Sequence, residues 1–418
     1  MALAATTIDK YLKQYAEPDI TDLRLSRCYD QVLVIPAFDE TWENISTVWN
    51  TLEDHFLCII VVNSASHHPI TEQLFQACLR SGKLLGQGRN WHHIQGKPDL
   101  LIFNRCTPDY FVPRKQGVGL ARKIGADAAL KLISLKNIAT HQINITDADA
   151  QLPDQYFEHR LAPSEAALLH PYYHQTSADE SPKYRQATLL YELKLAYYVR
   201  GLTHANSPYA FHSLGSTIVV NPLNYAQVRG FPKRSAAEDF YLLNKLRKTG
   251  QLRQLSSAAI KLSARPSTRV PIGTGQGILK LLDSTDALQS EAFYNPKIFD
   301  LLKTFLMVLE TSWLQMPGLS KLDQRLFNYV QREVLETKIG HLRIRCNSPE
   351  VFRKAILQWF DGFRTLKLIH FLRDQDLPDV SAINLVQVPW LSGPEGVISR
   401  ETTLLKNLGL LPATDIVS

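Results

Sequence analysis

The chain has 418 residues, 45% of them hydrophobic and 21% charged, which excludes a largely disordered protein and allows one large domain with an appendage, or two domains. The net charge of +6 is a mild bias that suits an anionic ligand, and without a dense Lys/Arg run or zinc-finger spacing it does not indicate nucleic acid binding. Five scattered cysteines without C-x-x-C spacing predict free thiols, and no apolar stretch reaches transmembrane length, so we expect a cytoplasmic protein.

The first part of the chain predicts a helix followed by a strand, a helix and a strand. Residues 1–30 show helical spacing and form an expected N-terminal extension. "QVLVIPAF" (31–38) is a β-rich apolar run, "TWENISTVWNTLED" (41–54) has helical spacing, and "FLCIIVVNSAS" (56–66) is a second buried run. This order predicts a right-handed βαβ unit and a parallel sheet.

The middle of the chain continues the alternation of helices and strands. Residues 81–115 are interpreted as loop because glycines and prolines are scattered through them. "GVGLARKIGADAALKLIS" (117–134) predicts a helix that begins at glycine, and "HQINIT" (141–146) predicts a third strand. A helix over 183–200 follows, and residues 211–232 contain a strand and a short helix.

The last predicted element of this alternating region is a helix over 236–250, acidic at its start and basic at its end. "ARPSTRVPIGTGQG" (264–277) then predicts a loop, and 275–375 is mostly helical in pattern. "AILQWFDGFRTLKLIHFLRD" (355–374) reads as one basic amphipathic helix, for which core packing, dimerisation and contact with a membrane surface stay open. We therefore expect segments 1–30, 31–265 and 266–418.

Two acidic pairs are the first candidates for chemistry. Asp147 and Asp149 follow the predicted third strand, and alternate residues at a strand end point the same way, so both carboxylates can face one ligand. Hard oxygen ligands suit Mg²⁺ or Mn²⁺, although a solvated loop is the competing interpretation. Glu238 and Asp239 begin a predicted helix, where they serve either as helix-start charges or as a general base.

Two further stretches are compatible with nucleotide binding. "VLVIPAFDE" (32–40) ends a strand in an acidic pair, Asp39 and Glu40. Gly117-Val118-Gly119 has basic flanks and resembles a phosphate cradle at a helix start, although the same glycines would permit close helix packing. The histidine doublets 67–68 and 92–93 match no metal-binding spacing, and no G-x-S-x-G or H-E-x-x-H motif supports a hydrolase.

Six segments in this order resemble the GT-A glycosyltransferases, and most closely their inverting family 2. These segments are "VIPAFDE", "IIVVNSAS", "GVGLARKIGADAAL", "NITDADAQLP", "LGSTIVVNPLNYAQVRGFP" and "AAEDFYLLNKLRKTG". The resemblance covers about residues 31–265. It implies an α/β fold with a mixed, mostly parallel sheet flanked by helices and a C-terminal helical extension. It also implies transfer of a sugar from a nucleotide diphosphate sugar, of UDP or GDP type, to an acceptor hydroxyl.

The resemblance carries over residue by residue. The first nucleotide-binding loop matches Pro36, Ala37, Asp39 and Glu40, and the segment beside the donor nucleotide matches Gly117 and Arg122. The Asp-x-Asp motif matches Asp147, Ala148 and Asp149, in which Asp149, with Asp147, is the expected ligand of Mn²⁺ or Mg²⁺. Gly215 and Ser216 match a strand facing the acceptor, and Glu238 and Asp239 match the pair whose aspartate is the usual catalytic base.

One position departs from the family pattern. The family commonly holds the nucleobase with an Asp after the second strand, and here Asn63 and Ser64 stand in that place. An amide still both donates and accepts hydrogen bonds, so we expect Asn63 to contact the base while the nucleobase stays open. Arg265 and Arg269, in the loop after the sheet, are expected to reach phosphate if that loop closes over the donor, or to form a linker.

Three alternatives remain at this level. A retaining transferase on the same fold would use Glu238 and Asp239 to position the acceptor. A non-catalytic nucleotide-sugar-binding protein would use the helical region for docking. A nucleotidyltransferase is less favoured because Pro36-Ala37-Phe38 stands where a glycine-rich loop is usual. The sequence leaves the acceptor and the oligomeric state open.

Overall fold

The computed structural model describes residues 2–176, 179–265, 273–313, 322–332, 334–391 and 399–411. These residues form two compact units, of which the first contains the chain up to 175 and 213–264, and the second contains 176–212 and most of the chain after 273. The units differ from the segments expected from the sequence. Residues 1–30 belong to the first unit, and helix α5 (Pro182–His204) belongs to the second.

A nine-stranded sheet forms the centre of the first unit, in the order β11-β8-β10-β6-β1-β2-β5-β4-β3. The strands are β1 (Gln31–Ala37), β2 (Phe56–Asn63), β3 (Lys83–Gln87), β4 (Trp91–Gln95), β5 (Asp99–Arg105), β6 (Ile143–Ile145), β8 (Glu165–Leu169), β10 (Ile218–Val220) and β11 (Gln251–Gln254). A second sheet has the order β7-β12-β9, with strands Ala150–Gln151, Ile260–Ser263 and Tyr172–Gln175.

The large sheet is mixed but mostly parallel. Only β4 and β10 run antiparallel to both of their neighbours, so the other seven of the nine strands share one direction. Every residue of β1 and β2 is buried, as expected for apolar strands covered on both faces. The predicted α/β class with a mostly parallel sheet and flanking helices is therefore confirmed.

The interpretation of 81–115 as a loop is wrong. This stretch contains β3, β4 and β5, and β5 pairs in parallel with β2 from Leu57↔Asp99 to Asn63↔Arg105. The glycines that suggested a loop are tolerated because strand formation here depends on pairing with distant strands. The helix predicted over 41–54 is also shorter than expected, with α2 (Trp42–Ser46) continuing only into the 3₁₀ turn η2 (Thr47–Trp49).

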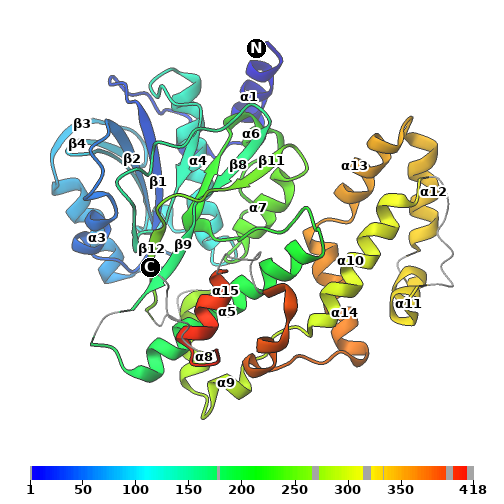
Figure 1. Cartoon of the computed structure of the whole chain (residues 1–418). Coiled ribbons are helices and arrows are strands. Elements are labelled where there is room, and N and C mark those ends of the chain that lie inside the picture. The colour runs from blue at the N-terminus through cyan, green and yellow to red at the C-terminus, as the bar shows by residue number, and fades with distance from the viewer. Residues whose placement is uncertain are drawn as a thin grey trace. The chain divides into compact units, whose positions relative to one another are not determined.

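Helices flank the sheet in the first unit (Figure 1). Besides α2 they are α1 (Ala2–Gln14), α3 (Pro69–Arg80), α4 (Gly117–Ser134), α6 (Pro222–Gln227) and α7 (Glu238–Leu246), with 3₁₀ turns η1 (Pro18–Ile20), η3 (Pro108–Tyr110) and η4 (Gly215–Thr217). Helix α4 packs closely on β1, because a Cβ on Gly125 would lie 2.4 Å from Cγ1 of Val34. The helix predicted to begin at Gly117 is thus buried along most of its length.

A buried polar network holds α1, α4 and α6 together. The Asp127 carboxylate accepts hydrogen bonds from the hydroxyls of Tyr11 (2.5 Å) and Tyr225 (2.9 Å) and from the ammonium of Lys123 (2.9 Å). The backbone N–H of Glu17 donates at 2.8 Å to Oδ2 of Asp127, the oxygen that also accepts from Lys123. Because these groups satisfy one another away from water, the N-terminal helix is fixed against the helix that carries Arg122.

The described part of the second unit is helical, as predicted for 275–375. In addition to α5 it contains α8 (Thr274–Leu282), α9 (Ala287–Ser290), α10 (Pro296–Thr311), α11 (Gln324–Arg332), α12 (Leu335–Arg345), α13 (Pro349–Trp359), α14 (Gly362–Asp376) and α15 (Arg400–Asn407), with η6 (Ala382–Gln387) and η7 (Pro389–Leu391). The Phe299 ring lies on the backbone of α5, 2.5 Å from where a Cβ on Gly201 would be.

The single amphipathic helix expected over 355–374 is two helices. Helix α13 ends at Trp359, and the Asp361 side chain caps α14 by accepting a hydrogen bond from the backbone N–H of Arg364 at 3.2 Å. Phe360, between the two helices, packs against Phe305 of α10 with ring centroids 5.0 Å apart. The aspartate and glycine at 361–362 therefore end one helix and start the next.

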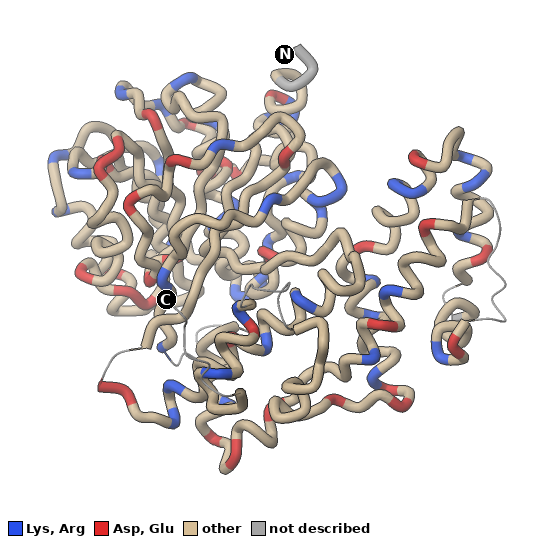
Figure 2. The backbone as a smooth tube through the Cα atoms, viewed as in Figure 1, with Lys and Arg blue, Asp and Glu red and all other residues tan. Residues whose placement is uncertain are grey.

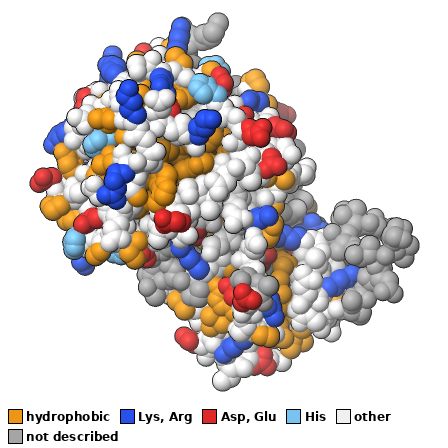
Figure 3. Space-filling model, turned by 90° about the vertical axis from the view of Figure 1, so that its left-hand side faces the viewer, with side chains coloured by type: hydrophobic (Ala, Val, Ile, Leu, Met, Phe, Trp, Pro, Cys, Tyr) orange, Lys and Arg blue, Asp and Glu red, His pale blue; other side chains and the backbone are white. Residues whose placement is uncertain are grey.

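Charges are distributed over the whole chain. Basic and acidic residues are interspersed along the backbone in Figure 2, in agreement with a small net charge of +6. On the face shown in Figure 3, hydrophobic side chains gather in a patch bordered by Lys and Arg side chains. None of the helices among the described residues is long and apolar enough to span a membrane.

Candidate functional site

The carboxyl ends of three parallel strands meet at one edge of the large sheet. β1 ends at Ala37, β2 at Asn63 and β6 at Ile145, and these strands are neighbours in the order β6-β1-β2. The residues that follow these strands are the ones that the sequence marks as candidates. The fold therefore brings the first loop, Asn63 and the Asp-x-Asp stretch to the same edge, where open α/β sheets bind ligands.

Arg122 joins the two acidic pairs. From the second turn of α4, its guanidinium donates hydrogen bonds through Nη2 to Oδ1 of Asp147 and through Nη1 to Oε1 of Glu238. Arg122 and Glu238 are only 5% and 3% exposed. Burial alone would lower the pKa of Arg122, but the carboxylates of Asp147, Glu238 and Asp239 hold it above its ordinary value, so the guanidinium stays charged.

Gly215 provides the space for this guanidinium. A Cβ at position 215 would lie 2.3 Å from Cζ of Arg122, which is closer than two non-bonded carbon atoms approach each other. The neighbouring Ser216 carbonyl accepts a hydrogen bond from Oγ1 of Thr146 at 2.9 Å, which ties η4 to the end of β6. The predicted pair Gly215 and Ser216 thus lies beside Arg122 and the Asp-x-Asp stretch.

Close backbone packing accounts for Gly117 and Gly119. The N–H of Gly119 donates to the carbonyl of Arg234 at 2.9 Å, and a Cβ there would lie 2.5 Å from that oxygen. Gly117 has a φ of +38°, and a Cβ there would lie 2.8 Å from Cα of Ser235. This contact holds the start of α4 against the segment that leads into α7, and so sets Arg122 beside Glu238.

Asp239 follows Glu238 in the first turn of α7. Its Oδ1 accepts a hydrogen bond from the backbone N–H of Phe240 at 2.7 Å. Burial and then the charge of Glu238 raise the pKa of Asp239 to about 7, while Arg122 opposes the rise. A carboxyl group that titrates near neutral pH is suited to accept a proton. Ala237, just before the pair, has a φ of +58°, which is a strained backbone of the kind found at functional sites.

The first loop is fixed by the start of α3. Asp39 has a φ of +55°, and its N–H donates to Oγ1 of Thr71 at 3.0 Å. The ring of Phe38 lies against His68, with centroids 4.8 Å apart. Glu40 is buried and accepts a hydrogen bond from Nδ2 of Asn44 at 3.5 Å.

Pro36 and Ala37 lie in a strand and not in the first loop, where the resemblance placed them. Both are buried within β1 and pair with Val61 and Val62 of β2. A proline is tolerated at a strand end because few ladder hydrogen bonds are lost there. The loop at the carboxyl end of β1 therefore begins at Phe38.

Two buried polar atoms lie at the carboxyl end of β2. Asn63 is 7% exposed and Ser64 is 2% exposed, yet Oδ1 of Asn63 and Oγ of Ser64 have no hydrogen-bond partner among the described residues. An unsatisfied buried polar atom costs about 1–3 kcal/mol. Such a cost is typical of groups that pair with a ligand or a water. The sequence assigned a role to Asn63 only, although the polar run after the strand was the signal for both.

The donor set around Asp149 suits an ion that is held largely by a substrate. No group of three or more His, Cys, Asp or Glu in the described part of the chain has the arrangement of a metal site. Asp147 is engaged by Arg122, while Asp149 is half-buried in the turn that follows β6. Mg²⁺ commonly binds one or two carboxylates together with phosphate oxygens, so these residues fit a metal that arrives with a diphosphate.

Arg265 groups with the second unit, and Arg269 lies outside the described residues. Their expected contact with phosphate stays a prediction.

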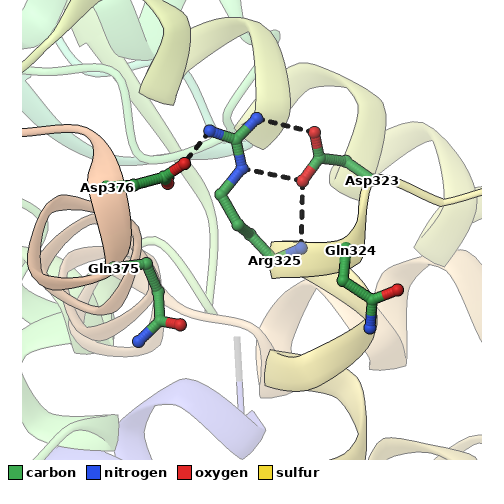
Figure 4. Close-up of a pocket in the computed structure, with 5 residues that line it drawn as sticks. All are labelled: Asp323, Gln324, Arg325, Gln375 and Asp376. Atoms are coloured by element: carbon green, nitrogen blue, oxygen red, sulfur yellow. Dashed lines mark hydrogen bonds and ion pairs between the residues drawn. The ribbon is translucent and has the colours of Figure 1, made fainter.

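A separate pocket in the second unit is lined by Asp323, Gln324, Arg325, Gln375 and Asp376 (Figure 4). Its arginine already donates to Asp323 at 2.7 Å and to Asp376 at 3.1 Å.

The fold and the site define an α/β protein with acidic groups around one buried arginine at the carboxyl edge of a mostly parallel sheet. Neither a family model nor a curated protein matches the chain. Among solved structures, the chain is similar to the mannosyltransferase PcManGT from Pyrobaculum calidifontis in complex with GDP-Man and Mn²⁺. The identity is 12%, the TM-score is 0.37, and the match covers 90% of this chain and 97% of that chain. A likeness at this level does not establish a shared family or activity.

Proposed function

We propose that the protein is a metal-dependent glycosyltransferase with a GT-A-type, family 2-like catalytic unit, which moves a sugar from a UDP or GDP sugar to an acceptor hydroxyl. The observation that carries the proposal is the convergence of Asp147 and Glu238 on Arg122. These residues come from separate segments that the family resemblance assigns to the donor and to the catalytic base. Their meeting at one sheet edge supports a single site for both.

The residues of this site have distinct roles in the proposed reaction. Asn63 and Ser64, whose buried oxygens lack partners in the described chain, bind the nucleobase. Asp149, together with the donor diphosphate, would hold Mn²⁺ or Mg²⁺, and the ion would supply positive charge beside the leaving group. Gly215 and Ser216 border the place of the donor sugar and the acceptor.

Asp239 accepts the proton of the acceptor hydroxyl as that hydroxyl attacks the anomeric carbon from the face opposite the leaving group. The carbon gains positive character as the bond to the diphosphate breaks, and the diphosphate leaves with the electron pair of that bond. The product then has the inverted anomeric configuration. A pKa of about 7 leaves a large part of Asp239 ionised at neutral pH and still basic enough to take the proton.

The direct test is nucleotide binding followed by two substitutions. We expect UDP or GDP to raise the melting temperature of the wild-type protein, and Mn²⁺ to increase this shift. Asp149→Ala should remove the metal-dependent part of the shift, while Asp239→Asn should retain it, and both variants should lose sugar transfer. The absence of any shift across nucleoside diphosphates and nucleotide sugars, with or without metal, would refute the proposed function.

Two alternatives have their own readouts. A retaining transferase would give a product of the same anomeric configuration as the donor, which NMR of the product distinguishes. A non-catalytic nucleotide-sugar-binding protein would bind a donor without turnover across a broad panel of acceptors. Peripheral contact with a membrane that carries the acceptor is compatible with transfer and is tested by co-sedimentation with vesicles.

A further inference from the structure

One carboxylate of each acidic pair binds the same cation, which is the guanidinium of Arg122. In the Asp-x-Asp stretch the group bound to Arg122 is Asp147, and at the start of α7 it is Glu238. Nη2 and Nη1 of Arg122 each serve one pair, so the guanidinium spans the two segments. Four carboxylates brought to one sheet edge repel one another, and a buried cation shared between them offsets that repulsion.

The position of this cation is determined by the backbone around it. Arg122 projects from α4, whose start is packed against residues 232–235 through Gly117 and Gly119. On another side the guanidinium lies on the backbone of Gly215, with no room for a β-carbon. A planar guanidinium that is enclosed in this way can hold two carboxylates in fixed directions, which a flexible ammonium cannot.

We propose that Arg122 is the positioning residue of the site, seated on Gly215, and that the two acidic pairs divide their work. Asp147 and Glu238 bind Arg122, whereas Asp149 serves the metal and Asp239 serves the acceptor. This inference rests on the proposed glycosyl transfer and revises the sequence-based expectation that Asp147 is a metal ligand. It also gives Gly215 a defined task, which is to make room for the guanidinium.

A double-mutant cycle between positions 122 and 215 tests whether the space at Gly215 determines the position of the Arg122 guanidinium. Gly215→Ala keeps every charged group but forces the guanidinium to move, and a displacement of about 1 Å at a catalytic site can cost about 100-fold in rate. We expect Gly215→Ala to lower kcat by about 10–100-fold while the Kd for the nucleoside diphosphate changes less than about 3-fold. In an Arg122→Lys background, the atoms that collide with the new methyl group are gone, so the same substitution should cost much less.

The control for a general effect of adding a methyl group is Gly86→Ala in β3. A Cβ there meets its nearest neighbour, the Trp91 ring, at an ordinary 3.9 Å, and kcat should stay at the wild-type value. All variants are assayed well below their melting temperatures, so that loss of folded protein is not read as loss of rate. A full kcat for Gly215→Ala, or an equal loss in the wild-type and Arg122→Lys backgrounds, would overturn the positioning role.

A comparison of the asparagine variants at positions 149 and 147 tests the different roles proposed for these two carboxylates. Asp149→Asn should abolish the Mn²⁺-dependent increase in nucleotide binding, and Asp147→Asn should keep that increase while lowering kcat. Equal loss of metal dependence in both variants would overturn the division. A wild-type protein that binds no nucleoside diphosphate would instead overturn the proposed function, so the two failures are distinguishable.

Discussion

Replacement of Asp239 by asparagine is the most informative single perturbation. The substitution keeps the shape of the side chain and its contact with the N–H of Phe240, but removes the group that accepts the proton. General-base assistance is typically worth about 10²–10⁴-fold, so we expect kcat to fall by that factor, which is about 2.7–5.4 kcal/mol of transition-state stabilisation. The loss should be measured at saturating donor and acceptor.

The pKa of Asp239 also predicts the pH dependence of the wild-type rate. With a pKa of about 7, about a tenth of the group is ionised at pH 6 and about nine tenths at pH 8, so kcat/KM should rise nearly tenfold over this range. At pH values between the ordinary pKa of an aspartate and the raised pKa of Asp239, the carboxyl group of Asp239 holds its proton more tightly in the folded state than in the unfolded chain. The contribution of Asp239 to stability therefore falls as the pH rises through this window.

The same substitution should stabilise the fold. At pH 8 wild-type Asp239 is a charged, desolvated group beside Glu238, whereas asparagine is neutral. We therefore expect Asp239→Asn to raise the melting temperature at pH 8 and to lose this advantage at pH 4, by differential scanning calorimetry. A variant that transfers sugar at the wild-type rate, or one that melts lower than the wild type at pH 8, would refute this account of Asp239.

Two further predictions concern the packing around α4, and each compares a substitution there with a second, milder one. Gly119→Ala should destabilise the fold by about 1–3 kcal/mol in urea unfolding, because its Cβ would lie 2.5 Å from two carbonyl oxygens. Gly340 in α12 has open space around it, so Gly340→Ala should raise the free energy of unfolding by about 0.4–1 kcal/mol. A fall in the free energy of unfolding as large as that of Gly119→Ala would contradict the packing argument. Asp127→Ala removes the carboxylate nearest to the buried ammonium of Lys123, leaves it only the more distant carboxylate of Glu17, and should cost about 3–5 kcal/mol. Tyr225→Phe removes one hydrogen bond to that carboxylate and should cost about 0.5–1.5 kcal/mol, and an equal cost for both would argue against a central role for Asp127.

The elements whose signals are local could be predicted from the sequence. The apolar runs of β1 and β2 and the helix that begins at Gly117 lie where the pattern predicts them, because continuous burial and helical periodicity are written into neighbouring residues. The order of motifs also led to the candidate residues Asp147, Asp149 and Asp239.

How these candidates relate to one another depends on tertiary contacts. The strands within 81–115 form through pairing with β2, which no local pattern reports. Arg122 carried only a weak signal, and its two contacts join it to residues 25 and 116 positions away. The roles of Gly119 and Gly215 depend on which backbone or side chain approaches them. Such contacts form only when the chain is folded, so the sequence identified the acidic groups, and the fold decided which of them the buried arginine holds.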